Sequence, residues 1–106
     1  MLIRSKAPLR LGLAGGGSDV APYCDLYGGA VLNASISLSS FCTIEPGDDG
    51  IVTFVASDRE ETFSAPCAPS YAYDGLLDLH KGVYNRVVRD FNDGQPLSLK
   101  ISTHSD

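Results

Sequence analysis

The sequence has few positive charges. Its 106 residues include 8 Lys and Arg against 13 Asp and Glu, which gives a formal net charge of −5. Binding to nucleic acid requires clustered Lys and Arg side chains that neutralise phosphates, and the chain has no such cluster. It also has no apolar run of the length that spans a bilayer. The composition therefore argues against a nucleic-acid partner and against a membrane-embedded protein.

Cysteine is scarce, and its copies are spaced far apart. The three copies, Cys24, Cys42 and Cys67, are an odd number without a C-x-x-C pair. That spacing does not meet the rules for a zinc site. The first ten residues lack the apolar stretch of a signal peptide. We therefore expect reduced thiols, no metal ligands and a cytoplasmic protein.

The stretch from Ala7 to Asp19 reads A-P-L-R-L-G-L-A-G-G-G-S-D. Leucines alternate with other residues in its first half, which predicts a strand with the leucines on one face and Arg10 on the other. The glycines at 15, 16 and 17 allow positive φ and leave room for a bulky group near the backbone. Because such a stretch is costly in conformational entropy, a ligand contact competes here with a plain tight turn.

Two nucleotide motifs are excluded for these glycines. No Gly-Lys-Ser/Thr follows, so the stretch is not a P-loop, and the G-x-G-x-x-G spacing fails at Val20. A glycine-rich turn that leads into a short helix still offers backbone N–H groups to an anion. The residues therefore leave both a ligand site and a structural turn open.

The polar residues at this corner have two readings each. Ser18 or Asp19 suits the N-cap of a short helix, and for Asp19 the spacing favours that reading. As a functional group, the Asp19 carboxylate would accept hydrogen bonds from sugar hydroxyls or act as an acid or base. Arg10 is either a solvated strand residue or a guanidinium placed for phosphate or transition-state charge.

The remaining pattern predicts an α+β chain with one mostly antiparallel sheet and helices on one face. Pro8 is expected to interrupt the first strand, and Ile51 to Ala56 is expected to return as a hairpin partner of the preceding strand. The predicted strands are Leu2 to Ala7, Leu9 to Ala14, Ala30 to Glu45, Ile51 to Ala56, Glu61 to Ser64 and Leu97 to Thr103, and the predicted helices are Val20 to Tyr27 and Gly75 to Asn92.

The longer predicted helix has Asp74 as its expected N-cap. Its apolar stripe is expected to face the core, and its polar positions are expected to face solvent. The stripe comprises Leu76, His80, Val83, Tyr84, Val87, Val88 and Phe91, and the polar side comprises Asp78, Lys81, Asn85 and Arg89.

Other chemistry-bearing residues have bland readings that compete with functional ones. His80 lies within the apolar stripe, which favours a packed, hydrogen-bonded histidine. The sequence H-S-D from His104 to Asp106 has the residue types of a hydrolytic triad, but sequence adjacency does not supply triad geometry. Tyr71 and Tyr73 either pack their loop or wall a nucleotide base.

From Ala7 to Asp19, together with Tyr23 and the stretch G-G-A-V-L-N from Gly28 to Asn33, the chain resembles the GHMP kinases. Within that superfamily the pattern is most similar to the branch that phosphorylates D-glycero-D-manno-heptose 7-phosphate at C1. The resemblance implies a ribosomal-protein-S5-domain-2-like sandwich, ATP and Mg²⁺ as cofactors, and a sugar phosphate as substrate. It covers the whole chain as an N-terminal portion.

The resemblance also implies roles for individual residues. Arg10 matches an arginine near the reacting hydroxyl, and Asp19 matches an aspartate that binds sugar hydroxyls. Gly16 and Gly17 stand where galactokinases carry Glu and His, so the site has more room and fewer hydroxyl partners. We therefore expect Arg10 to be catalytic, and we expect substrate contacts from the four residues Gly15, Gly16, Gly17 and Ser18 together with Asp19.

The family's ATP phosphate loop, P-x-x-x-G-L-G-S-S, would follow Asp106, so residues 1–106 are expected to be a GHMP N-terminal domain cut before that loop. Phosphoryl transfer depends on positioning and charge neutralisation, so we expect this piece to be inactive alone. The adenine-contacting residues and the oligomeric state are not specified. The alternatives are a non-catalytic ligand-binding or assembly domain of the same fold, or a kinase for fucose or galactose.

Overall fold

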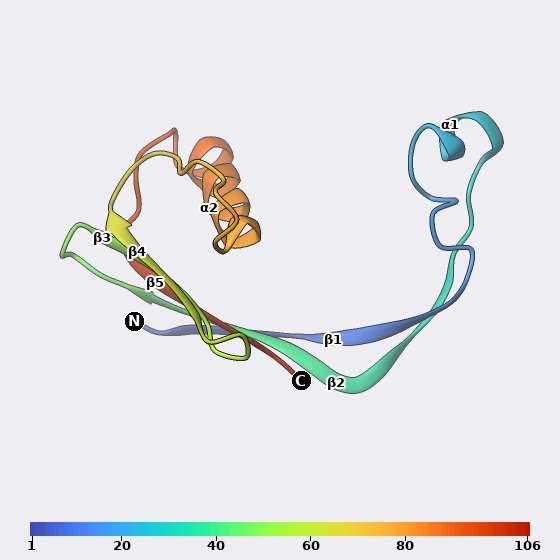
Figure 1. The fold of residues 1–106 in the computed structure, drawn as a ribbon, viewed down its shortest axis with the longest axis horizontal. Helices are drawn as coiled ribbons and strands as arrows, with labels where there is room; N and C mark the ends of the chain where they lie inside the picture. Colours follow the sequence, from blue (N-terminus) through green and yellow to red (C-terminus); the bar gives the residue numbers. More distant parts are fainter. The chain divides into compact units, whose positions relative to one another are not determined.

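The computed structural model describes all residues from Met1 to Asp106. The α+β class is confirmed, and neither helix has the length and apolar character needed to cross a bilayer. In chain order the elements are strand β1 (Ile3–Ala14), helix α1 (Tyr23–Tyr27), strands β2 (Leu32–Pro46), β3 (Ile51–Ala56) and β4 (Glu61–Pro66), helix α2 (Asp78–Phe91) and strand β5 (Leu99–Ser105) (Figure 1).

The strands form one sheet in the order β1-β2-β5-β3-β4. Strand β3 pairs antiparallel with β4, which places Phe54 opposite Phe63, and parallel with β5, which places Phe54 opposite Ile101. The sheet is therefore mixed, with a parallel pair that the sequence pattern did not predict. The expected β2–β3 hairpin is wrong, because β5 lies between these two strands.

Strand β1 is continuous through Pro8, so the two predicted strand segments are a single strand. Proline cannot donate a ladder hydrogen bond, and it is tolerated here because β1 is the first strand in the sheet order and has a free edge. The chain divides into two compact units: Met1–Ser5 with Phe41–Ser105, and Lys6–Ser40 with Asp106.

The larger unit holds the hydrophobic core. Val52, Phe54 and Ala56 alternate along β3 and are all buried, as a strand with one covered face requires. Helix α2 lies over this part of the sheet (Figure 1) and contributes Tyr84 and Val88 to the core. Burying these side chains is the main stabilising contribution to this unit.

Helix α2 begins three residues later than predicted, and Asp74 is not its cap. The N-cap position is Leu77, which adopts the left-handed conformation (φ 51°, ψ 41°) and makes no side-chain cap hydrogen bond. The Asp74 carboxylate instead accepts hydrogen bonds from the amide of Leu76 at 3.0 Å and from the ammonium of Lys81 at 2.6 Å. These bonds hold the chain in a turn before the helix begins.

The helix is also rotated relative to the prediction. Lys81 was expected to face solvent, yet it is 1% exposed and belongs to a buried stripe with Leu77, Tyr84 and Val88. The expected core positions Val83 and Phe91, by contrast, are 55% and 80% exposed. Lys81 lies on the side of the helix that faces the sheet, where its ammonium is over the Phe63 ring of β4 and beside the Asp74 carboxylate of the preceding loop.

Candidate functional site

The triple glycine forms a turn directly after β1. Gly15 and Gly17 have φ values of 84° and 91°, whereas Gly16 is not in the left-handed region. A Cβ on Gly15 would overlap the carbonyl oxygen of Ala30, so glycine is required there by a close backbone approach. Around Gly16 and Gly17 the space is open. These two glycines therefore leave their backbone accessible to a ligand.

Ser18 closes this turn through its hydroxyl group. The hydroxyl lies 2.6 Å from the carbonyl oxygen of Gly15 and 2.9 Å from that of Ala30, and it accepts a hydrogen bond from the Ala30 amide at 3.2 Å. The Ser18 amide also donates to the Gly15 carbonyl at 3.1 Å. The side chain is therefore engaged within the protein.

Neither Ser18 nor Asp19 caps the following helix, so the cap reading is wrong. Helix α1 covers only Tyr23–Tyr27, its N-cap position is Pro22, and no side chain makes a cap hydrogen bond. The chain between Ser18 and α1 is a series of turns, including a bond from the Val20 amide to the Gly17 carbonyl at 3.3 Å. The Asp19 side chain is exposed and is left without a structural partner.

Arg10 lies within β1, and its side chain is exposed. It forms no ion pair with Asp19 or with any other carboxylate. The structure thus joins Gly15 and Ser18 by hydrogen bonds but does not join Arg10 to the glycine turn by a protein contact. A guanidinium without an internal partner retains all five N–H donors for a phosphate or carboxylate.

The sequence-based site omitted the segment that packs against the turn. Gly28 has a φ of 74°, and a Cβ on Gly29 would overlap the carbonyl oxygen of Ser18. The backbone of Ala30 is hydrogen-bonded to the Ser18 hydroxyl, as described above. The second glycine pair was the sequence signal for this contact, since two glycine clusters separated by a short helix allow two backbones to meet.

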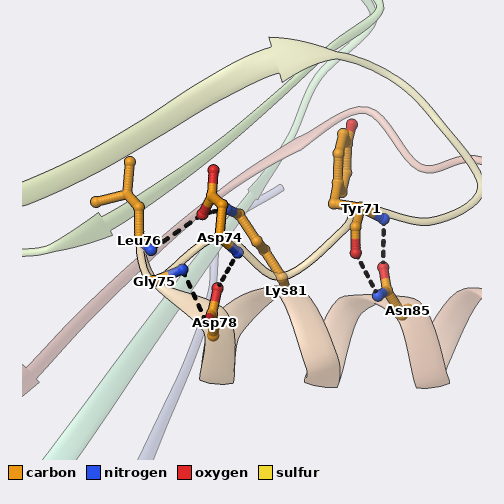
Figure 2. Close-up of polar contacts among 7 residues, drawn as sticks. All are labelled: Tyr71, Asp74, Gly75, Leu76, Asp78, Lys81 and Asn85. Atoms are coloured by element: carbon orange, nitrogen blue, oxygen red, sulfur yellow. Dashed lines mark hydrogen bonds and ion pairs between the residues drawn. The ribbon is translucent and has the colours of Figure 1, made fainter.

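A polar cluster in the larger unit joins the loop before α2 to the helix (Figure 2). The Asp78 carboxylate accepts hydrogen bonds from the amides of Asp74 at 3.1 Å and Gly75 at 3.0 Å. The Lys81 ammonium lies 4.5 Å from the centre of the Phe63 ring. The hydrogen bond from Lys81, and then that from the Leu76 amide, holds the pKa of Asp74 below its ordinary value.

Tyr71 packs its loop, as the bland reading predicted. Its ring contacts those of Phe54, Phe63 and Tyr84 at centroid distances of 5.2–6.4 Å. Its backbone is clamped by Asn85, which accepts from the Tyr71 amide at 2.8 Å and donates to its carbonyl at 2.9 Å (Figure 2). Tyr71 is therefore not available to wall a nucleotide base.

Tyr73 lies in an open groove beside α2. The groove has a volume of about 430 Å³, and its lining is mainly apolar. Tyr73 itself is 64% exposed, so the reading as a wall for a base stays a hypothesis for this residue alone. The lining residues are Tyr73, Asp78, Leu79, Gly82, Val83, Arg86, Val87 and Phe91.

Neither histidine belongs to the glycine corner, which is the turn of residues 15–19 that follows β1. His80 is half-buried, and its Nε2 lies 2.8 Å from the Thr103 hydroxyl, which confirms the packed, hydrogen-bonded reading. Burial lowers the pKa of His80. His104 lies against the ring of Phe41, and the carboxylate of Asp106 accepts a hydrogen bond from the Ser39 amide at 2.9 Å. These contacts give His104 and Asp106 structural roles beside residues of β2.

The exposed carboxylate of Asp19 and the open backbone of Gly16 and Gly17 have the chemistry to bind a polar, hydroxyl-rich molecule. An unpartnered carboxylate accepts hydrogen bonds from hydroxyl groups, and open glycine backbone offers N–H donors. The chain has no group of three or more His, Cys, Asp or Glu side chains placed to hold a metal ion.

Comparison with known proteins places this arrangement in a class. No protein-family model matches the chain. Its structure is similar to that of a galactokinase from Lactococcus lactis complexed with galactose, with a TM-score of 0.66 over 98% of this chain and 26% of that protein. At 17% identity this likeness concerns the fold alone. The chain therefore shares its fold with part of a galactokinase.

Two kinases that act on heptose phosphates are more similar in sequence. The chain is 46% identical over 104 residues to the D-glycero-alpha-D-manno-heptose 7-phosphate kinase of Campylobacter jejuni, covering 98% of this chain and 30% of that protein. It is 50% identical, with a TM-score of 0.87, to a D-glycero-D-manno-heptose 1-phosphate kinase from Bacteroides thetaiotaomicron, covering 100% of this chain and 34% of that one. The chain thus spans about a third of these relatives and corresponds to their N-terminal portion.

Proposed function

We propose that the chain is the N-terminal, sugar-binding portion of an ATP-dependent kinase that phosphorylates the C1 hydroxyl of a heptose phosphate. The observation that carries this proposal is the 46% identity to a heptose 7-phosphate kinase over 98% of the chain. The glycine corner supports it, because an open turn beside a free carboxylate suits a polyhydroxylated ligand. The product would serve the route toward GDP-heptose for surface polysaccharide.

In this proposal each residue of the corner has a defined task. Asp19 accepts hydrogen bonds from sugar hydroxyls, and Arg10 stabilises negative charge near the reacting hydroxyl. Gly16 and Gly17 leave the space that a sugar phosphate larger than a hexose requires. Gly15 and Ser18 complete the substrate-binding turn.

The nucleotide side is assigned to the rest of the enzyme. ATP and Mg²⁺ are the proposed cofactors of the complete kinase, and they supply the transferred phosphoryl group and the neutralisation of its charge. Residues 1–106 are proposed to be an S5-domain-2-like N-terminal domain that is followed by the ATP phosphate loop. Reaction in the cytoplasm is proposed because the nucleotide is available there.

The experiment is a substrate screen with the polypeptide encoded by the complete reading frame. Phosphate transfer from ATP is measured with heptose 7-phosphate, fucose and galactose as acceptors. We expect heptose 7-phosphate to give the highest kcat/KM and the 106-residue chain to give no turnover. Preference for fucose or galactose would contradict the proposed heptose-phosphate substrate. Turnover by the 106-residue chain would contradict the proposal that the nucleotide side of the site belongs to the rest of the enzyme.

A second candidate is a non-catalytic ligand-binding or assembly domain of the same fold. It is favoured by the open backbone at Gly16 and Gly17, which can bind a hydroxyl-rich ligand without a nucleotide. The nucleotide sequence after the codon for Asp106 discriminates between the two. Continuation into a Gly/Ser-rich loop supports the kinase, whereas a stop codon supports the separate domain, which would then bind the sugar phosphate without ATP.

A further inference from the structure

The Ser18 hydroxyl has little capacity left for a ligand. A hydroxyl group has one proton and two acceptor lone pairs. One lone pair accepts the Ala30 amide at 3.2 Å, and the proton is directed to the carbonyl of Gly15 or Ala30, at 2.6 and 2.9 Å. The side chain that the sequence assigned to substrate is therefore already engaged in a bond between two backbone segments.

The two backbone segments also interlock without side chains. Gly15 is the position where a Cβ would overlap the Ala30 carbonyl, and Gly29 is the position where a Cβ would overlap the Ser18 carbonyl. Each segment thus contributes one glycine to the contact, and Ser18 lies at its centre. The backbone on either side of Ser18 is held by this contact, while Gly16 and Gly17 remain open.

Asp19 follows Ser18 directly and has no structural partner of its own. Its carboxylate is therefore oriented by the backbone to which it is attached, and that backbone is fixed by Ser18. We infer that Ser18 is a positioning residue, which presents the Asp19 carboxylate to the sugar hydroxyls without touching the sugar. This inference rests on the proposed function for the role of Asp19, but the Ser18–Ala30 contact stands independently of it.

The first test concerns the contact and needs no enzyme activity. Amide hydrogen exchange is measured on the 106-residue chain as wild type, as Ser18→Ala and as Ser70→Ala, a control in an exposed loop serine without a hydrogen bond. We expect the Ala30 amide to exchange roughly tenfold faster in Ser18→Ala and at the wild-type rate in Ser70→Ala. Unchanged exchange at Ala30 in Ser18→Ala would overturn the inference.

The second test separates positioning from direct contact by a double-mutant cycle in the complete kinase. If Ser18 acts through Asp19, Ser18→Ala lowers kcat/KM for the sugar phosphate roughly tenfold, leaves the KM for ATP unchanged, and has no further effect in an Asp19→Asn background. Ser18→Thr, which keeps the hydroxyl, restores activity. Additive losses would overturn the inference and would indicate that Ser18 touches the sugar itself.

The two tests distinguish failure of the inference from failure of the proposed function. If Asp19→Asn leaves the kinetics of every tested sugar unchanged, the proposed role of Asp19 is wrong, and the inference falls with it even if the Ala30 amide responds. If Asp19→Asn lowers activity while Ser18→Ala does not, the proposed function stands and the positioning role is wrong.

Discussion

The ammonium nitrogen of Lys81 lies 2.6 Å from Oδ1 of Asp74, although the two side chains differ greatly in exposure, at 1% and 63%. The cation is therefore desolvated while its anion remains in contact with water. A buried charge that loses its partner is costly, whereas an exposed charge is solvated by water instead. The two halves of this ion pair are consequently not equivalent.

Removal of the Asp74 charge is expected to destabilise the fold more than removal of the Lys81 charge. Asp74→Asn leaves a buried ammonium with a weaker acceptor, whereas Lys81→Met keeps the packing on Phe63 and leaves an exposed carboxylate. Thermal denaturation should therefore give a lower midpoint for Asp74→Asn than for Lys81→Met. Asp90→Asn, which affects only surface pairs with Arg86 and Arg89, is the control and should have the smallest effect. A larger effect of Lys81→Met would contradict this account.

The pKa of His80 is expected to make stability depend on pH in the weakly acidic range. Because burial lowers this pKa below the ordinary value of 6.5, the unfolded chain binds the proton more readily than the folded one. The contribution is fully present above pH 6.5 and is lost as the pH falls toward the folded pKa. Urea denaturation at several pH values should show this loss in the wild type and a flatter profile in His80→Asn. If the free energy of unfolding depended on pH equally in the wild type and in His80→Asn, the assignment of the pH dependence to His80 would be wrong.

The rotation of α2 can be tested with two identical substitutions on one helix. Val88 is fully buried, and Val83 is 55% exposed. Val88→Ala should lower the free energy of unfolding by about 2 kcal/mol, through lost burial and a residual cavity. Val83→Ala should change it by less than about 0.5 kcal/mol, as surface substitutions usually do. Similar values for both, measured by urea denaturation, would indicate that the helix faces the sheet differently.

The glycine corner offers a matched pair of substitutions as well. Gly15→Ala introduces a Cβ that overlaps the Ala30 carbonyl at a positive φ, so backbone has to move. Gly16→Ala meets open space. We expect Gly15→Ala to abolish protection of the Ala30 amide in hydrogen exchange and Gly16→Ala to leave it intact. Retained protection in Gly15→Ala would show that the two segments do not approach each other as described.

For the proposed complete kinase, Arg10→Ala and Asp19→Ala should lower activity far more than stability. Both side chains are exposed and have no structural partner, so the free energy of unfolding should change by less than about 0.5 kcal/mol. Loss of charge stabilisation or substrate orientation should lower kcat/KM by on the order of 100-fold. Parallel denaturation and kinetic measurements check this, and Lys100→Ala, on an exposed β5 position, is the control. Equal losses of fold and activity would favour purely structural roles.

The sequence predicted most elements because their signals are local. Alternation along β3 depends on neighbouring residues, and it is present as the buried side chains of Val52, Phe54 and Ala56. The strand order has no local signal in the sequence, because the insertion of β5 between β2 and β3 depends on a pairing of residues far apart in the chain. A hairpin was the natural prediction for two strands joined by a short turn.

The errors in the site and in α2 have a common physical cause. A polar residue at a helix start predicts a cap, but Asp74 and Ser18 both form bonds to groups that only the tertiary fold brings near. For Lys81, charge predicted exposure, and the partner that permits burial lies in a loop whose path the periodicity does not encode. The roles of Arg10 and Asp19 come from resemblance and stay a prediction.

The position of β5 has a consequence for how the protein is made. The strand that lies between β2 and β3 is the last of the five to be synthesised. Until Leu99–Ser105 has left the ribosome, the nascent chain carries two strand edges whose backbone groups lack their final partner. Unpaired edges are the places where chains associate wrongly, so this interval is when a molecular chaperone would protect the protein most.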